Sequence, residues 1–487
     1  MAAKFYAAAH AARGVTLADL RRDVVGIDTE IPLLDGTRRP YVFLDNAAST
    51  PTFGSVLRRI AEFMPWYSGV HRGVGFKAVV ATNVYDQTRR IAGEFVGADL
   101  SRNVVLFMRN TTECVNRLAH HLDLRPDDVV VSTLMEHHSN DLPWRKYCRV
   151  VRAGIRPDGG IDLRQLRDEL GRWKASVRLV AVSGASNVIG ICNPIHEIAE
   201  WAHEAGARIF VDAAQLVAHR RVDMRPGDDP GHIDFLAYSA HKIYAPFGVG
   251  VLIGPSDFFS GREPELVGGG TVSYVGAEDV EWASLPQREE AGSPNVVGAV
   301  ALAEALSILG GIGMDVIADH ERALLEYALR RLGSIGGLRI YGPVDDLREK
   351  VGVIPFNVDG MDHALVATIL STEGGIGVRN GNFCAQPYMR ALLGVSAGEE
   401  QAARAARCDQ PVLPGMVRAS LGCYNTEEDI DFLADMLERI VKNEYSGSYF
   451  VDPVTGMYRT ETYQVNPAEH FRFFDSRNAP PRGEEIA

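Results

Sequence analysis

Short apolar runs alternate with amphipathic segments over residues 41–300. The runs that predict strands lie at 41–44, 104–107, 128–133, 177–186, 208–215 and 233–238. Helical patterns begin near residues 55, 77, 111, 139 and 194. Strands that alternate with helices predict an α/β domain, in which a mostly parallel sheet lies between helices. Such sheets bind ligands at the carboxyl ends of their strands.

The pattern changes after a long helical segment at 291–311. Beyond it, helical patterns recur at 313–333, 362–371, 385–393 and 426–442, and strand patterns near 338–341 and 351–357. We therefore expect a smaller α+β domain over 301–445, with a polar insertion at 394–414. Residues 1–40 are expected to pack on this domain. The tail, 446–487, is expected either to wrap over a neighbouring surface or to be partly disordered.

Composition restricts the partners and the compartment. The 487 residues are 46% apolar and 23% charged, and the net charge is −13. This acidic balance disfavours binding to nucleic acid or to an anionic membrane. No apolar run approaches the ~20 residues that span a bilayer, and the first residues do not resemble a signal peptide. The six cysteines form no CxxC pair. We expect a protein of the reducing cytoplasm, without disulfides or a metal site.

The stretch HIDFLAYSAHKIYAPFGVG, at 232–250, places a lysine where a buried strand ends. Burial lowers the pKa of an amine and makes Lys242 a nucleophile, which a Schiff base with a carbonyl cofactor requires. Taken alone, Lys242 is better explained as a solvated loop residue, because most lysines lie on surfaces.

Other polar groups follow neighbouring predicted strands. Asn110-Thr111-Thr112 stands at a strand-to-helix junction, where it predicts either a phosphate cradle or a plain helix cap. EHHSN, at 136–140, brings two histidines that could stack on a flat ring or move protons, although such a pair is more often structural. Asp212 ends RIFVD and could hold a pyridinium N–H, whereas the commoner role of such a residue is a helix cap.

Two further candidates lie together in GIGVRNGNFCAQP. The guanidinium of Arg379 could bind a carboxylate through two hydrogen bonds. Cys384, close to a predicted helix start, could be held as a nucleophilic thiolate, although on its own it fits a structural cysteine better.

In this order, the segments resemble the class V aminotransferase family, which belongs to fold type I of the pyridoxal 5'-phosphate (PLP) enzymes. The closest likeness is to the cysteine desulfurase/selenocysteine lyase branch. It extends from about Tyr41 to Ile440, and its most specific pieces are YSAHK (238–242), MEHHSN (135–140), VDAAQ (211–215), EAGSPN (290–295), VRNGNFCAQP (378–387) and VRASLGCYNTEED (417–429). The resemblance implies a large PLP-binding domain over 41–300 with the small domain after it. Six collinear segments make a separate structural explanation for each one untenable.

The resemblance implies a role for each residue at the cofactor ring. Lys242 would bind the cofactor covalently and move the proton at the substrate Cα. Asp212 would pair with the pyridine nitrogen, Gln215 would bond the ring oxygen, and His137 would stack on the ring.

The phosphate and the substrate have their own implied residues. Thr112, Ser239 and His241 would hold the phosphate, with Thr111 nearby. Ser293 would reach the phosphate in the partner subunit of a homodimer.

Asn187 and Arg379 would hold the carboxylate of the amino acid substrate. Cys384 would take the substrate sulfur as a persulfide and leave alanine.

This chain departs from the branch in three places, all around the thiol and the substrate. The loop at His71 reads HRGVG, so a second histidine common in the family is missing. Asn382 and Phe383 stand where the branch commonly carries two histidines. The insertion 394–414 has no counterpart in the members with a short loop. Because none of these changes touches the cofactor residues, PLP binding is the firmer expectation.

The favoured hypothesis is a homodimeric PLP enzyme that desulfurates L-cysteine and passes the sulfur to an acceptor protein. Another class V reaction on a specialised substrate, such as β-elimination, a C–S or C–N lyase step, epimerisation or transamination, would leave Cys384 without a role. A non-catalytic scaffold is the third hypothesis, and the intact Lys242 and Asp212 argue against it.

Overall fold

A seven-stranded sheet organises the larger part of the molecule, in the order β4-β10-β9-β8-β7-β5-β6. Its strands are β4 (Asn103–Met108), β5 (Val129–Thr133), β6 (Arg149–Ala153), β7 (Val177–Ser183), β8 (Arg208–Asp212), β9 (Phe235–Ser239) and β10 (Gly250–Pro255). Only β10 runs antiparallel to its neighbours, β4 and β9. The computed structural model describes residues 16–405, 414–453 and 455–473. Within them, the predicted α/β class with a mostly parallel sheet is confirmed.

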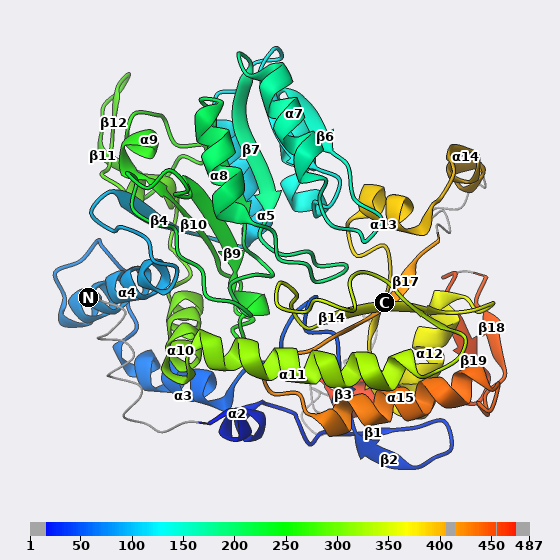
Figure 1. The fold of residues 1–487 in the computed structure, drawn as a ribbon. Coiled ribbons are helices and arrows are strands. Elements are labelled where there is room, and N and C mark those ends of the chain that lie inside the picture. Colours follow the sequence, from blue (N-terminus) through cyan, green and yellow to red (C-terminus); the bar gives the residue numbers. More distant parts are fainter. Residues whose placement is uncertain (1–15, 406–413, 454, 474–487) are drawn as a thin grey trace, which may run out of the picture.

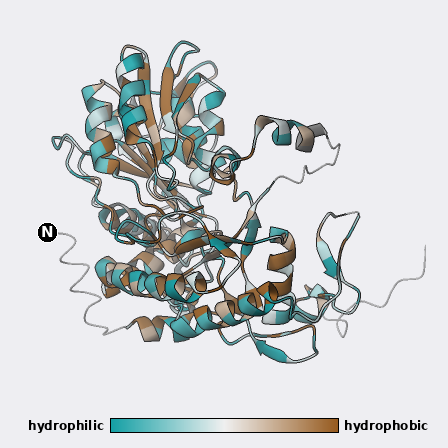
Figure 2. Ribbon diagram, turned by 45° about the vertical axis from the view of Figure 1, so that its right-hand side comes forward, coloured by the Kyte–Doolittle hydropathy of each residue, from teal (hydrophilic) through white to brown (hydrophobic). Residues whose placement is uncertain are grey.

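Helices cover both faces of this sheet (Figure 1). Alternate residues of one strand enter different cores: Val105 and Phe107 pack on one side, and Val104 and Leu106 on the other. The first side holds α4 (Phe76–Phe95), α7 (Leu163–Trp173), α8 (Ile195–Glu204) and α10 (Val296–Ile312). The second holds α5 (Thr111–His121), α6 (Leu142–Arg145) and α9 (Ser256–Ser260). The strands are therefore apolar on both faces, as the brown sheet between mixed helices in Figure 2 shows.

A second core lies between a four-stranded antiparallel sheet and three helices. The sheet contains β13 (Leu338–Ile340), β14 (Val353–Val358), β17 (Met416–Ser420) and β16 (Arg379–Gly381). The helices are α11 (Met314–Gly333), α12 (His363–Gly374) and α15 (Glu427–Val441). The boundary expected at residue 300 falls inside α10, which is buried all round in the first core. The chain bends by 77° between α10 and α11, at Gly313, and α11 then enters the second core.

The N-terminal segment contacts both cores. α2 (Leu17–Asp23) begins with a capping box between Thr16 and Asp19. Arg21 forms an ion pair of 2.8 Å with Asp429 of α15, while Leu20 packs in the first core. The other elements before α4 are β1 (Glu30–Pro32), β2 (Arg38–Pro40), β3 (Val42–Phe43), α3 (Gly54–Phe63) and η1 (Met64–Trp66). β3 pairs in parallel with β15 (Ile376–Gly377) of the smaller domain.

The insertion and the tail add short elements. α13 (Gln386–Leu393) leads to α14 (Ala397–Ala405), which projects from the body (Figure 1), and residues 406–413 of the insertion lie outside the described residues. In the tail, β18 (Tyr449–Val451) and β19 (Tyr458–Thr460) form a hairpin, and α16 (Pro467–His470) follows. The hydroxyl of Tyr449 bonds to Thr372 and to Glu373 of α12, so this part of the tail covers the smaller domain.

The features that were not predicted from the sequence include β6, α7 and the hairpin of β11 (Val272–Val275) and β12 (Val280–Trp282). The shorter β1–β2 and β18–β19 hairpins, α9 and α14 were not predicted either. Among the described residues, no single helix is long and apolar enough to cross a membrane; α10 and α11 meet that test only as a sharply bent pair.

Candidate active site

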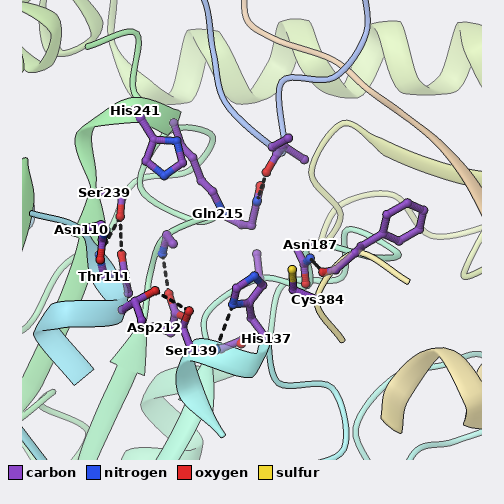
Figure 3. Close-up of a pocket in the computed structure, with 18 of the residues that line it drawn as sticks. Asn110, Thr111, His137, Ser139, Asn187, Asp212, Gln215, Ser239, His241 and Cys384 are labelled. Carbon is purple, nitrogen blue, oxygen red and sulfur yellow. Dashed lines mark hydrogen bonds between the residues drawn. The ribbon is translucent and has the colours of Figure 1, made fainter. Parts of the chain in front are cut away.

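A cavity of about 500 Å³ lies where the central sheet meets the smaller domain. All the predicted site residues except Ser293 line it. They come from the carboxyl ends of β5, β7, β8 and β9, from the start of α5 and from the segment that carries Arg379 and Cys384 (Figure 3). The structure thus brings together side chains from position 111 to position 384. We expect a ligand site at this edge of a parallel sheet.

Lys242 ends a short turn, η3 (Ala240–Lys242), directly after β9. Removal from bulk water, with a smaller contribution from nearby Arg418, lowers the pKa of its amine to about 8, although Asp212 opposes the shift. Asp212 lies at the end of the adjacent strand, β8, and burial raises the pKa of its carboxyl. The carboxylate accepts the Ala214 N–H at 3.0 Å and lines the same cavity as the amine.

The start of α5 forms a cradle of donors. Asn110 caps this helix, and Ser239 Oγ accepts the Thr111 N–H at 2.8 Å and contacts the Thr111 hydroxyl at 2.7 Å. The Thr112 hydroxyl lies 2.6 Å from that of Ser139. Hydroxyls and free N–H groups at a helix start are suited to a phosphate. A Cβ at Gly250 would lie 2.5 Å from the Asn110 carbonyl carbon, so only glycine lets β10 approach this cradle.

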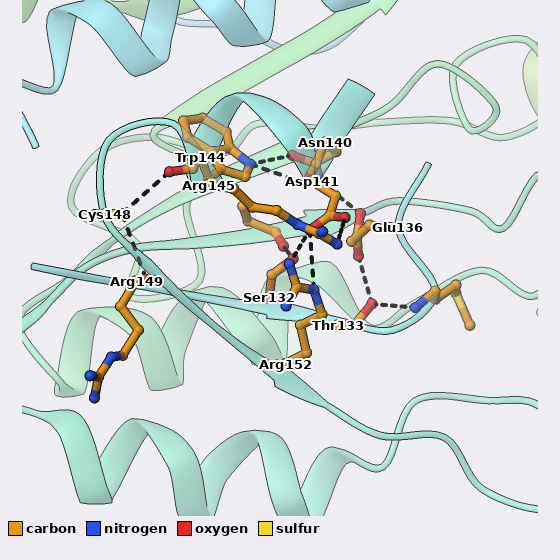
Figure 4. A network of polar contacts seen from close by, with 12 residues as sticks. Ser132, Thr133, Glu136, Asn140, Asp141, Trp144, Arg145, Cys148, Arg149 and Arg152 are labelled. Atoms are coloured by element: carbon orange, nitrogen blue, oxygen red, sulfur yellow. Dashed lines mark hydrogen bonds and ion pairs between the residues drawn. The ribbon is translucent and has the colours of Figure 1, made fainter. Parts of the chain in front are cut away.

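The buried carboxylate of Glu136 fixes the segment 136–140 through hydrogen bonds. Glu136 accepts the hydroxyl of Thr133 at 2.7 Å and the amide of Asn140 at 2.6 Å (Figure 4). It also accepts the hydroxyl of Ser183 at 2.7 Å. Burial raises the pKa of Glu136 to about 7, although these hydrogen bonds oppose the shift. The network fixes the loop that presents His137. This segment was predicted as part of the site, but no role was predicted for Glu136.

Both histidines that face the cavity are neutral at physiological pH. Burial and the nearby Lys242 lower the pKa of His137 to about 3 and that of His241 to about 4. The Nδ1 of His137 accepts the Ser139 N–H at 3.1 Å, which fixes the orientation of the ring. A neutral imidazole held in this way is suited to stack on a flat, cationic ring.

Two predicted amides are already engaged. Gln215 Nε2 donates to the Ala47 carbonyl at 2.6 Å. Asn187 Nδ2 donates to the Phe383 carbonyl at 2.7 Å, so this side chain contacts the Cys384 segment. Both residues still line the cavity.

Two arginines share one carboxylate beside the cavity. Arg379 and Arg418 form ion pairs with Asp45, at 2.8 and 3.1 Å. Arg418 is 2% exposed, and burial lowers its pKa to about 10. Neither Arg418 nor Asp45 was predicted from the sequence as a site residue. The available signal was an arginine inside the apolar strand MVRASL, where a charge requires a partner.

Cys384 is exposed and lines the cavity together with Lys242. Ser293 lies apart from it, between Gly292 and Pro294, which border a second cavity of about 480 Å³. That cavity also contains His71. The role predicted for Ser293 needs a second subunit and stays a prediction.

One group of potential metal ligands occurs among the described residues: His203, His232 and Asp234. It lies at the opposite end of β9 from Lys242. His203 bonds to Asp234 at 3.0 Å and its ring stacks on that of His232, with centroids 4.2 Å apart. The absence of a bound metal stays a prediction.

The donor set fits PLP. The cavity contains one amine of lowered pKa, a buried carboxylate 30 positions earlier in the sequence, a neutral imidazole and a cradle of hydroxyls at a helix start. These match the aldehyde, the pyridine nitrogen, the ring face and the phosphate of that cofactor.

Comparison with known proteins agrees with this geometry. The family model for aminotransferase class V matches residues 42–433. A cysteine desulfurase of Cronobacter sakazakii is 36% identical over 426 residues, which cover 85% of this chain and 97% of that protein. A probable cysteine desulfurase of Halalkalibacterium halodurans is 36% identical over 420 residues, covering 84% and 95%. A cysteine desulfurase structure from Thermococcus onnurineus superposes with a TM-score of 0.74 at 31% identity, covering 87% of this chain and 98% of that one. The chain belongs to the class V aminotransferase family, in its cysteine desulfurase branch.

Proposed function

We propose that this chain is a PLP-dependent cysteine desulfurase, which converts L-cysteine to L-alanine and keeps the sulfur as a persulfide on Cys384. The observation that carries the proposal is one cavity lined by an amine, Lys242, and an exposed thiol, Cys384. The names of the relatives agree with it.

In the proposed complex, Lys242 would hold the cofactor, Asp212 would face its pyridine nitrogen, and His137 would cover its ring. When bound, PLP supplies an electron sink that stabilises negative charge at the substrate Cα. Thr111, Thr112, Ser239 and His241 would hold the phosphate. Gln215 would face the ring oxygen.

Arg379 and Arg418 are the cations available for the substrate carboxylate. Asp45 pairs with both and so holds the two guanidinium groups in place. Arg418 also donates to the Asn187 carbonyl at 2.9 Å, while its Nε has no partner among the described residues. Asn187, which holds the Phe383 carbonyl, would complete this end of the site.

Two residues move atoms. The neutral amine of Lys242 accepts the proton from the substrate Cα. The Cys384 thiolate then attacks the substrate sulfur, so that an S–S bond forms while the C–S bond breaks. The electron pair of the broken bond stays with the substrate Cβ, which takes up a proton and becomes the methyl group of alanine, and the protonated Lys242 returns a proton to Cα. Cysteine plus the enzyme thiol thus give alanine plus the enzyme persulfide.

The same proposal includes partners and a compartment. A homodimer would bring Ser293 to the phosphate of the other subunit. A sulfur-acceptor protein would remove the persulfide at the exposed Cys384. A cytoplasmic location is consistent with this role, because the thiol must remain reduced between turnovers.

Product analysis with L-cysteine tests the proposal. We expect one alanine for each cysteine consumed. In the absence of a reductant, we also expect a persulfide on Cys384 in the mass spectrum. Cys384→Ser should retain the cofactor absorption but lose persulfide formation, whereas Cys148→Ser, outside the cavity, should leave both unchanged. If Cys384→Ser forms alanine as fast as the parent, the thiol has no role in the reaction.

A further inference from the structure

The segment that carries Cys384 has a strained backbone. Phe383 and Cys384 have φ values of +48° and +54°, so two consecutive residues other than glycine adopt the left-handed region. Such conformations persist only where the surrounding structure holds them.

Three hydrogen bonds hold its main chain. Asn187 Nδ2 donates to the Phe383 carbonyl at 2.7 Å, and the His138 N–H donates to the Cys384 carbonyl, also at 2.7 Å. The Gln386 N–H donates to His138 Nε2 at 3.2 Å. His138 thus contacts the chain on both sides of residue 385, immediately after the thiol.

A cation–π contact also holds the segment. The Phe383 side chain is 9% exposed, and the Arg418 guanidinium lies 4.7 Å from the centre of its ring. This phenylalanine stands where the branch commonly has a histidine. The segment is therefore fixed to two residues that also line the cavity, Asn187 and Arg418.

The hydrogen bond from the Gln386 N–H requires that Nε2 of His138 is unprotonated. A ring nitrogen that accepts an N–H must be unprotonated. Burial lowers the pKa of His138, and Arg145 and Arg390 lower it further, against the opposite effect of Asp141. The two adjacent histidines therefore face different partners: His137 faces the cavity, and His138 holds the segment after Cys384.

We propose that His138 is a positioning residue, whose side chain holds the Gln386 N–H and so keeps the Cys384 thiol in place at the cavity. This inference rests on the proposed role of Cys384 as the nucleophile. The side chain of His138 is not proposed to contact the cofactor, the substrate or the sulfur of Cys384. It acts through the first turn of α13 and the strained residues before it.

Substitutions that differ in one acceptor test this role. His138→Gln places an amide oxygen close to the position of Nε2. His138→Leu has no acceptor, and the side chain of His138→Asn is too short for its amide oxygen to reach the Gln386 N–H. For the last two we expect kcat for alanine formation to fall by roughly 10- to 100-fold, as for a misplaced reacting group, with KM for cysteine within about twofold. His138→Gln should recover most of kcat. His120→Leu, on the exposed side of α5, is the matched control and should change nothing.

Hydrogen exchange supplies a readout that does not depend on catalysis. The Gln386 amide should exchange at least tenfold faster in His138→Leu and His138→Asn than in the parent and in His138→Gln, while the cofactor absorption stays the same in all four. Equal kcat and equal exchange in His138→Leu and the parent would overturn the proposal, as would a Gln variant as impaired as the Leu variant. If the parent forms no alanine from cysteine, the proposed function fails, but the exchange result still decides whether His138 holds the segment.

Discussion

At the scale of single residues, the cavity controls protonation through burial. The amine of Lys242 and the imidazoles of His137 and His241 are all shifted toward their neutral forms. Asp212 is the one buried carboxylate whose attraction opposes the shift at Lys242. Burial and the charge of Asp212 together therefore set the fraction of Lys242 that is unprotonated, and so nucleophilic, at neutral pH.

This balance predicts the pH dependence of cofactor capture by protein stripped of PLP. An amine captures the aldehyde only when unprotonated, so the rate should rise with pH and level off above about 8, the pKa of Lys242. An ordinary lysine would continue to gain rate until about pH 10. Because Asp212 raises this pKa, Asp212→Asn should move the midpoint to lower pH. The measurement is the visible absorption after rapid mixing with PLP. A midpoint near 10 in both proteins would contradict the assignment.

The residues that the sequence could reveal were those in local motifs. Lys242 and Asp212 each end an apolar run, so their position followed from neighbours in the chain. Arg418 could not be placed in this way, because its partner, Asp45, lies far away in the sequence. Glu136 was hidden for the same reason, since Ser183, two of whose groups bond to it, belongs to another strand.

At the scale of elements, the cofactor cradle depends on how closely α5 approaches β10. Gly250 pairs with Met108 of β4 and Ser239 of β9, and it faces the main chain of Asn110 at the helix start. A side chain there would have to displace backbone atoms. The absence of a Cβ at Gly250 therefore allows the N–H and hydroxyl groups of Thr111 to lie where they do.

Gly250→Ala should weaken the cradle. The added Cβ would meet three main-chain atoms of Asn110 at 2.5 to 2.8 Å, which forces the start of α5 away from Ser239. We expect the dissociation constant for PLP to rise by roughly tenfold or more and the free energy of unfolding to fall by about 1–3 kcal/mol. PLP titration and urea unfolding of the stripped protein measure the two effects. Gly171→Ala is the control, because a Cβ there meets nothing within 4 Å. Equal PLP affinity in both variants would show that the close approach is unimportant.

The elements that sequence analysis predicted well were those with a strong, uninterrupted pattern, such as α10 and α11. β6 and α7 were missed because two of the five residues of RVVRA are arginines and α7 is rich in charged residues. The hairpin of β11 and β12 was missed because its apolar side chains are exposed, so that no buried face produces an alternating pattern. Tertiary contacts, not local preference, define these elements.

At the scale of the whole molecule, several apolar side chains are exposed in the segments that border the second cavity. Val74 is 100% exposed and Phe76 74%, and both follow the loop of His71 and Arg72. That loop and the residues that flank the β11–β12 hairpin border the same cavity, as do the neighbours of Ser293. Tyr274 and Val275 of the hairpin are also more than half exposed. Exposed apolar groups that gather in this way mark interaction sites, and the proposed homodimer would cover them.

Val74→Glu and Phe76→Glu test that assembly. Because both side chains point into solvent in the single chain, a charge there should leave the folded subunit stable. In a dimer, each substitution would bury an unpaired carboxylate twice, so we expect the dissociation constant of the dimer to rise at least tenfold. Val316→Glu on α11, an exposed apolar position outside these segments, is the matched control.

Sedimentation velocity gives the oligomeric state. PLP retention gives a second readout, because the loss of Ser293 from the other subunit should weaken the hold on the phosphate. A parent protein that sediments as a monomer with PLP bound, or a Val74→Glu dimer as stable as the parent, would show that these exposed groups have another purpose.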